Sequence, residues 1–370
     1  MRKEFDKKER LLSLDALRGF DMLFIMGLAT WVVALCNLFP SSGVMQWLSS
    51  QMRHVEWNGL AQHDTIFPLF LFIAGVSFPF SIAKQRAAGK SEKQIFVKII
   101  TRGIVLVLLG MVYNDFFKLD FANMRCASVL GRIGLAWMFS ALLFMKLKNK
   151  LLAVIAAFIL VGYWLLLWLI PGGPDTYSFE HNLVGVVDRV LLPGKLYSGN
   201  HFDPEGLLST LPAIVTAMLG MFTGKFIRIS NDRISGNRKT LYMVAAAVAL
   251  LLTGLLWSYV FPVNKKLWSS SFVCVVAAYS LFLLALFYYI IDVKGYRRWT
   301  FFFRVVGMNS ITIYLAQDII SFRQIARFFF GGIAGMFPQE WGNLILVTGY
   351  IAICWLFLYF LYKKNIFLKV

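Results

Sequence analysis

Long apolar segments recur along the whole chain, and they constrain the fold more than any other feature. Each is close to 20 residues long, which is the length at which an α-helix crosses the hydrocarbon core of a bilayer. We assign ten such segments, at roughly 14–38, 64–83, 95–115, 127–146, 151–170, 206–227, 240–261, 270–291, 303–321 and 342–362. Because lipid offers no partner to an open backbone polar group, such segments cross as helices. The sequence therefore predicts an all-α, polytopic membrane bundle.

Composition excludes the main alternative, a soluble globular fold. Hydrophobic residues make up 59% of the 370 residues and charged residues 15%, against about 45–50% and about 25% in soluble domains. A soluble fold has too little interior to hide that much apolar surface. We expect one membrane domain over 1–370, with a cytoplasmic tail at 1–12 and a long extracytoplasmic loop at 171–205.

Basic residues alternate between the two ends of the predicted spans. One set of tails and connections holds 25 Lys and Arg, whereas the opposite set holds 9. By the positive-inside rule, both chain termini then lie in the cytoplasm. The formal net charge of +18 is accordingly a topology signal from loops beside anionic membrane lipids, and we expect no nucleic-acid partner.

Arg18, Arg102 and Arg132 fall inside the predicted spans, where an ionisable group needs a partner or a cavity. Asp15, Arg18 and Asp21 share one helical face at the cytoplasmic end of the first span. They form either a local ion pair that anchors the helix end, or a site in which Arg18 binds a phosphate of an anionic cofactor. Arg102 and Arg132 have the same two interpretations, as salt-bridge partners within a helix or as pyrophosphate ligands.

All four histidines fall on the predicted external side or at its rim. His54 and His63 flank Asn58 and precede Asp64 at the mouth of the second span. Histidine accepts a proton near neutral pH, and a nearby carboxylate can orient its ring. The spacing does not match a zinc site, and the four cysteines show no metal-binding or redox spacing, so we expect neither metal nor disulfide. These features fit a transporter or an enzyme that works across the bilayer.

Short motifs occur in a fixed order from about residue 12 to 362. They are LDALRGF at 14–20, HVEWNGL at 54–60 followed by DTIFPLFLFI at 64–73, VLGRI at 129–133, DPEGLL at 203–208, FPVNKKLW at 261–268 and GMNS at 307–310. In this order they resemble the motifs of the transmembrane acyltransferases related to heparan-alpha-glucosaminide N-acetyltransferase. One position departs from the family: about eleven residues after Arg18, where the family has a functional asparagine, the chain has Ala29.

The resemblance implies an activity, a site and an assembly. Acetyl-CoA would bind from the cytoplasm, and its acetyl group would pass to the amine of a terminal glucosamine on the far side. The functional histidine of the family falls on His54, which would act as general base, or as a transient acetyl carrier, with Asp64 and Asn58 beside it. The resemblance also suggests a homodimer, and we place the protein in a bacterial cytoplasmic (inner) membrane.

Further contacts follow from this hypothesis. Arg18, Arg238 and Lys239 would bind the phosphates of CoA at the cytoplasmic mouth, and Asn309 would be a polar contact within the membrane or an interhelical hydrogen bond. At the external rim, Trp57, Asp203 and Glu205 would receive the cationic amino sugar; the two acids could equally cap a helix N-terminus. Two other functions stay open, an O-acyltransferase that modifies a surface glycan and a sugar or anion transporter.

Overall fold

The computed structural model describes residues 11–170, 172, 175–197, 199 and 201–368. Residues 1–10 of the predicted cytoplasmic tail and parts of the 171–205 loop therefore lie outside the described residues. Within the described part the chain is helical, without a strand, and one isolated antiparallel bridge joins Arg125 and Gly194. Nine helices in this part are long and apolar enough to cross a membrane. The all-α polytopic prediction is confirmed.

The spanning helices follow the predicted segments closely. They are α2 (Leu12–Leu23), continued by η1 (Phe24–Leu28) and α3 (Ala29–Cys36); α5 (Gln62–Ala87); α6 (Glu92–Tyr113); α7 (Val129–Lys146); α8 (Asn149–Leu169); α10 (Thr210–Ile227); α11 (Gly236–Trp257); α12 (Ser270–Tyr288), continued by η3 (Tyr289–Val293); and α16 (Gln339–Lys363). Shorter helices lie between them: α4 (Gly43–Gln51), η2 (Phe116–Lys118), α9 (Leu183–Leu191), α13 (Thr300–Met308), α14 (Ser310–Ile319) and α15 (Phe322–Ala334).

The ninth predicted span, 303–321, is broken in the structure. Helix α13 ends at Met308 and α14 begins at Ser310, because Asn309 has φ −126° and ψ 30°, outside the helical region. Asparagine hydrogen-bonds readily to nearby backbone and favours such interruptions over a helix interior. The segment is therefore a pair of short helices and is absent from the nine long ones among the described residues.

Internal packing divides the described chain into two compact units. Unit 1 comprises the residues up to 55, residues 61–66 and the residues from 286 on; unit 2 comprises 56–60 and 67–285. The expectation of a single domain over the whole chain stays a prediction. Each unit is described by itself below.

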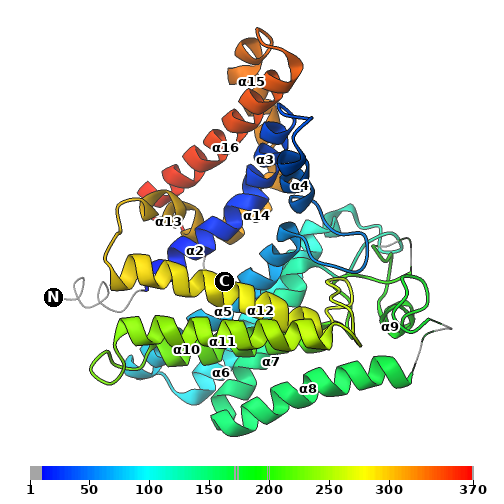
Figure 1. The fold of residues 1–370 in the computed structure, drawn as a ribbon, viewed down its shortest axis with the longest axis vertical. Helices are drawn as coiled ribbons and strands as arrows, with labels where there is room; N and C mark the ends of the chain where they lie inside the picture. Colours follow the sequence, from blue (N-terminus) through cyan, green and yellow to red (C-terminus); the bar gives the residue numbers. More distant parts are fainter. Residues whose placement is uncertain (1–10, 171, 173–174, 198, 200, 369–370) are drawn as a thin grey trace. The chain divides into compact units, whose positions relative to one another are not determined.

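In unit 1, α2 and α13 cross with their backbones in contact. A Cβ atom added to Gly19 would lie 1.8 Å from the carbonyl oxygen of Phe303, and one added to Gly307 would lie 2.2 Å from that of Asp15. Only glycine permits this approach. The crossing joins two of the sequence motifs, LDALRGF and GMNS. Elsewhere in the unit, α15 folds back along α16 (Figure 1).

In unit 2, α5 and α10 cross in the same way, at three glycines. A Cβ at Gly75 would lie 2.2 Å from the carbonyl oxygen of Ala217, and one at Gly220 would lie 2.2 Å from that of Phe72. One turn further along α10, Gly224 approaches the carbonyl oxygen of Val76 in the same manner. Small residues allow membrane helices to gain close van der Waals contact where lipid gives no hydrophobic drive to association.

Candidate functional site

His54 and Asp64 form a hydrogen-bonded pair in unit 1. The His54 Nδ1 lies 2.7 Å from Asp64 Oδ1, and the other carboxylate oxygen accepts the backbone N–H groups of Val55 and Ala61 at 3.3 and 3.2 Å. The Asp64 side chain is 1% exposed, whereas that of His54 is 53% exposed. A fixed carboxylate at Nδ1 favours the tautomer that carries its proton there. In that tautomer the basic nitrogen of the half-exposed ring is Nε2.

A second histidine lies against this pair. The ring centroids of His63 and His54 are 4.6 Å apart, with the rings inclined by 51°. The sequence placed His63 at the mouth of the span but assigned it no role. Its signal was its position directly before Asp64, at the start of α5.

In unit 2, the WNG and FPVN motifs join. The Asn264 side chain donates from Nδ2 to Asn58 Oδ1 at 3.1 Å, and the Gly59 N–H donates to the Val263 carbonyl at 2.8 Å. Gly59 has φ 119°, a conformation that side-chain-bearing residues rarely adopt. These contacts hold Asn58, which is exposed, in a fixed orientation.

Trp57 is held by a hydrogen bond and by aromatic contacts. Its indole N–H donates to the carbonyl of Tyr177 at 2.8 Å, and its ring packs edge-on against Phe179 and Phe202 at 5.2 and 5.4 Å. The ammonium of Lys266 lies 5.9 Å from the ring centroid. The residue predicted to bind sugar is thus half-buried in an aromatic cluster.

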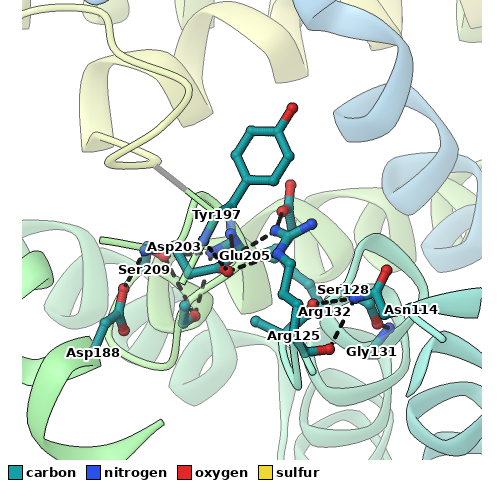
Figure 2. Close-up of polar contacts among 12 residues, drawn as sticks. Asn114, Arg125, Ser128, Gly131, Arg132, Asp188, Tyr197, Asp203, Glu205 and Ser209 are labelled. Atoms are coloured by element: carbon teal, nitrogen blue, oxygen red, sulfur yellow. Dashed lines mark hydrogen bonds and ion pairs between the residues drawn. The ribbon is translucent and has the colours of Figure 1, made fainter. Parts of the chain in front are cut away.

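Asp203 and Glu205 of the DPEGLL motif bind an arginine that the sequence analysis missed. Arg125 donates from Nε to Asp203 at 2.7 Å, from Nη2 to the other Asp203 oxygen at 2.5 Å, and also from Nη2 to Glu205 (Figure 2). Burial opposes the charge on Arg125, but these hydrogen bonds and the two carboxylate charges outweigh it and raise the pKa of the guanidinium. Bidentate pairing of this kind fixes geometry as well as charge.

The same motif contacts Arg132, which is 1% exposed. Its Nη2 donates to the carbonyl of Gly206 at 3.3 Å and to the hydroxyl of Ser209. The guanidinium lies over the ring of Trp268, 5.0 Å from its centroid. Within the described part of the chain, its Nε and Nη1 atoms have no hydrogen-bond partner.

Asp188 also binds the DPEGLL motif, through its backbone. Its two carboxyl oxygens accept the N–H groups of Asp203 and Leu207, each at 3.1 Å. The side chain is fully buried, and burial raises its pKa to about 6. A Cβ added to Gly206 would collide with this carboxyl group at 2.1 Å, so glycine is required at that position.

The residues predicted to bind CoA have varied surroundings. Arg18 lies 3.8 Å from Asp15, as the ion-pair interpretation predicts, and Arg102 lies over the Trp137 ring at 4.3 Å. The ammonium of Lys239 donates to the carbonyls of Ile227 and Ile229 and to Asn231, and so caps the end of α10. The two other predicted contacts differ in exposure: Arg238 is exposed, and Asn309 is 2% exposed, with its Nδ2 unpartnered among the described residues.

No group of three or more His, Cys, Asp or Glu side chains is placed to hold a metal ion in the part of the chain that the structure describes. The four cysteines are free thiols, and three of them are buried. The structure brings together His54 with Asp64, Asn58 with Asn264, and Asp203 with Glu205.

These features define the class as a polytopic helical membrane protein in which a carboxylate in the first turn of a long apolar helix orients a histidine of the preceding segment. The chain is distantly related to the heparan-alpha-glucosaminide N-acetyltransferases, which confirms the resemblance seen in the motifs. It is 27% identical to the Mus musculus protein over 432 residues, covering 99% of this chain and 62% of that protein. With the Homo sapiens protein it shares 27% over 430 residues, covering 98% and 60%. The chain thus spans about 60% of the length of these curated relatives, and no family model matches it.

Proposed function

We propose that the protein is a membrane acetyltransferase that moves an acetyl group from cytoplasmic acetyl-CoA to the amine of a glucosamine-type sugar on the extracytoplasmic side. The observation that carries the proposal is the His54–Asp64 pair, with its 2.7 Å contact and half-exposed ring. The names of the two relatives, both heparan-alpha-glucosaminide N-acetyltransferases, support the transfer of an acetyl group to glucosamine.

The pair can perform the proton transfers that this reaction needs. An ammonium group has no lone pair, so the sugar amine must first release one proton to solvent before its nitrogen attacks the thioester carbonyl carbon. The Nε2 of His54 accepts a proton from the attacking nitrogen as the new C–N bond forms, while Asp64 stabilises the imidazolium. When the C–S bond breaks, the imidazolium returns the proton to the departing thiolate, which leaves as the thiol of CoA.

We propose Arg18 and Arg238 as CoA contacts because both carry a positive charge and both are accessible. Arg238 is exposed and Arg18 retains 23% exposure of its side chain, so both can reach a phosphate group. Both lie where the charge alternation places the cytoplasm. A bacterial cytoplasmic membrane and a homodimer complete the proposal.

The test is transfer of labelled acetyl from acetyl-CoA to glucosamine by the purified protein. His54→Ala should lower kcat by about 10²–10⁴-fold, because general-base catalysis typically contributes that much. His181→Ala removes an exposed histidine of the external loop and serves as the matched control, with unchanged turnover. If His54→Ala turned over as fast as the wild-type protein, His54 would not be the general base.

Product chemistry separates the other functions. Mild alkali cleaves an O-acetyl ester and leaves an N-acetyl amide intact, so alkali-stable product supports the amine as acceptor. A transporter would instead carry unmodified sugar into vesicles without any acyl donor. Uptake of this kind, without acetylated product, would overturn the enzyme proposal.

A further inference from the structure

His63 and His54 lie ring against ring in unit 1. Their ring centroids are 4.6 Å apart, and the ring planes are inclined by 51°. His63 is the second residue of α5 and directly precedes Asp64, which binds His54 Nδ1. The two rings and the carboxylate therefore form one cluster of ionisable groups within a single compact unit. The proton transfers proposed for His54 do not use His63.

The proposed reaction releases one proton that the His54–Asp64 pair does not take up. A protonated sugar amine carries three hydrogens on its nitrogen, and the amide product carries one. Of the two protons that leave, one passes through His54 to the thiolate of CoA, and the other must reach the solvent. A neutral imidazole accepts only one proton, so His54 cannot hold both. A second proton acceptor beside the first would complete the reaction.

The two histidines have different surroundings, which suit two different tasks. Asp64 Oδ1 lies 2.7 Å from His54 Nδ1, so His54 can hold a proton as an imidazolium until the thiolate leaves. The Nδ1 atom of His63 is buried, which leaves Nε2 as the nitrogen that a substrate can reach. His63 is also partly exposed, so a proton on its ring can pass on to water.

The ring contact gives the two protons an order. Two imidazolium rings at 4.6 Å repel each other, so a proton on His63 opposes the uptake of a second proton by His54. Asp64 offsets part of this repulsion, whereas the neighbouring Arg53 is exposed and its charge is screened by water. The first proton should therefore leave His63 for the solvent before the sugar nitrogen attacks.

We propose that His63 is a second proton acceptor, which takes the first proton from the ammonium group of the acceptor sugar and releases it to solvent. The proposal rests on the proposed function. An N–H bond of the ammonium group breaks, its electron pair stays on nitrogen, and the proton binds Nε2 of His63 and passes to water. The neutral amine then attacks the thioester, and His54 transfers the second proton to the departing thiolate. One ammonium ion and one thioester thus give one amide, one thiol and one proton.

The test compares two acceptors that differ in the charge on nitrogen. Glucosamine arrives largely as an ammonium ion at neutral pH, whereas an aminooxy analogue of the sugar is uncharged and needs to lose only one proton. His63→Gln keeps a polar side chain but removes the group that takes up a proton. We expect it to lower kcat with glucosamine by about 10–100-fold, at the low end for acid–base catalysis because water can also take this proton. The kcat with the aminooxy sugar should stay at the wild-type value.

Two control variants belong to the same experiment. His54→Ala should be slow with both acceptors, because each of them loses a proton to His54 during the attack. His181→Ala, which changes an exposed histidine, should match the wild-type protein with both. Added imidazole, a base that can diffuse to the site, should raise the turnover of glucosamine by His63→Gln. It would not do so if His63 only held the start of α5 in place.

The outcomes separate this proposal from the proposed function. Equal losses with both acceptors would make His63 a structural residue, and no loss with glucosamine would mean that the proton reaches solvent directly; either result overturns the proposal. Both acceptors are measured on the same preparation, so partial misfolding of the variant would lower both rates and cannot imitate the expected result. If the wild-type protein transfers acetyl to neither acceptor, the proposed function falls, and the role of His63 falls with it.

Discussion

Asp188 is a buried carboxyl group outside the spanning helices, and its ionisation should make stability depend on pH. Burial raises its pKa to about 6, against about 3.9 in an unfolded chain. Between these values the folded protein holds a proton that the unfolded chain has released, so stability falls as pH rises from about 4 to about 6. The shift corresponds to roughly 3 kcal/mol.

Asp188→Asn removes this ionisation and keeps an oxygen that can accept the N–H of Asp203 or Leu207. We expect the thermal midpoint of the variant, relative to wild type, to rise between pH 4.5 and pH 7.5. The measurement is thermal unfolding of the detergent-solubilised protein at both pH values. A difference that is constant or shrinks over this range contradicts the raised pKa.

The sequence indicates contacts between neighbouring residues better than contacts between distant ones. His54 and Asp64 are ten residues apart, and a carboxylate at the first turn of a span was a visible partner for the ring. Arg125 belongs to no motif and meets Asp203 from 78 residues away. The signal that could have found it was the DPEGLL motif itself, since two acids only two residues apart favour a cation between them.

At the scale of helices, the crossing of α5 and α10 should tolerate no side chain at Gly220. Its added Cβ would lie 2.2 Å from the Phe72 carbonyl oxygen, a backbone atom that cannot swing away. We expect Gly220→Ala to destabilise the protein by about 1–3 kcal/mol through overpacking. The readout is the temperature at which half of the solubilised protein leaves the monodisperse peak in size-exclusion chromatography.

Gly162 on α8 provides the matched control. Nothing lies within 4 Å of a Cβ added there. Gly162→Ala should stabilise the helix slightly, because alanine loses less backbone entropy than glycine. Equal midpoints for the two variants would show that the α5–α10 crossing is not as close as the structure has it.

The ends of the spanning helices agree with the predicted segments to within a few residues, because hydropathy averaged over a whole segment is a strong signal. The break at Asn309 escaped this reasoning. One polar residue hardly alters the apolar character of a 20-residue segment, yet it places backbone angles outside the helical region. The sequence therefore predicted that 303–321 is helical, but a single residue, Asn309, decided that it is two helices instead of one.

Across the whole molecule, the sequence motifs meet in pairs within each unit. LDALRGF meets GMNS at Gly19 and Gly307, and VLGRI meets DPEGLL through Arg132. HVEWNGL meets FPVNKKLW through Asn58. The order of motifs along the chain was visible in one sequence, whereas their pairing required the folded backbone. Each of these motifs therefore forms one side of a contact, and a second motif forms the other side.

The number of membrane crossings follows from the lengths of the helices and from the alternation of basic residues along the chain. Among the described residues, nine helices are long enough to cross, and an odd number would place the two termini on opposite sides. The alternation of basic residues instead requires an even number, with both termini in the cytoplasm. The helices α13 and α14 can supply the crossing that is missing from an even number. Together they cover 300–319 and would extend about 30 Å if they run on in one direction. That length is enough to cross a bilayer despite the break at Asn309.

We therefore expect the α13–α14 segment to cross. Alkaline phosphatase, which is active only outside the cytoplasm, should be active when fused after Pro338 and inactive when fused after Lys364. Fluorescent protein fused at the second position should be bright. A fusion after Gly89, in a connection with many Lys and Arg, gives the cytoplasmic control. Phosphatase activity at Lys364 together with none at Pro338 would mean that α13 and α14 form a re-entrant hairpin, with nine crossings and the C-terminus outside.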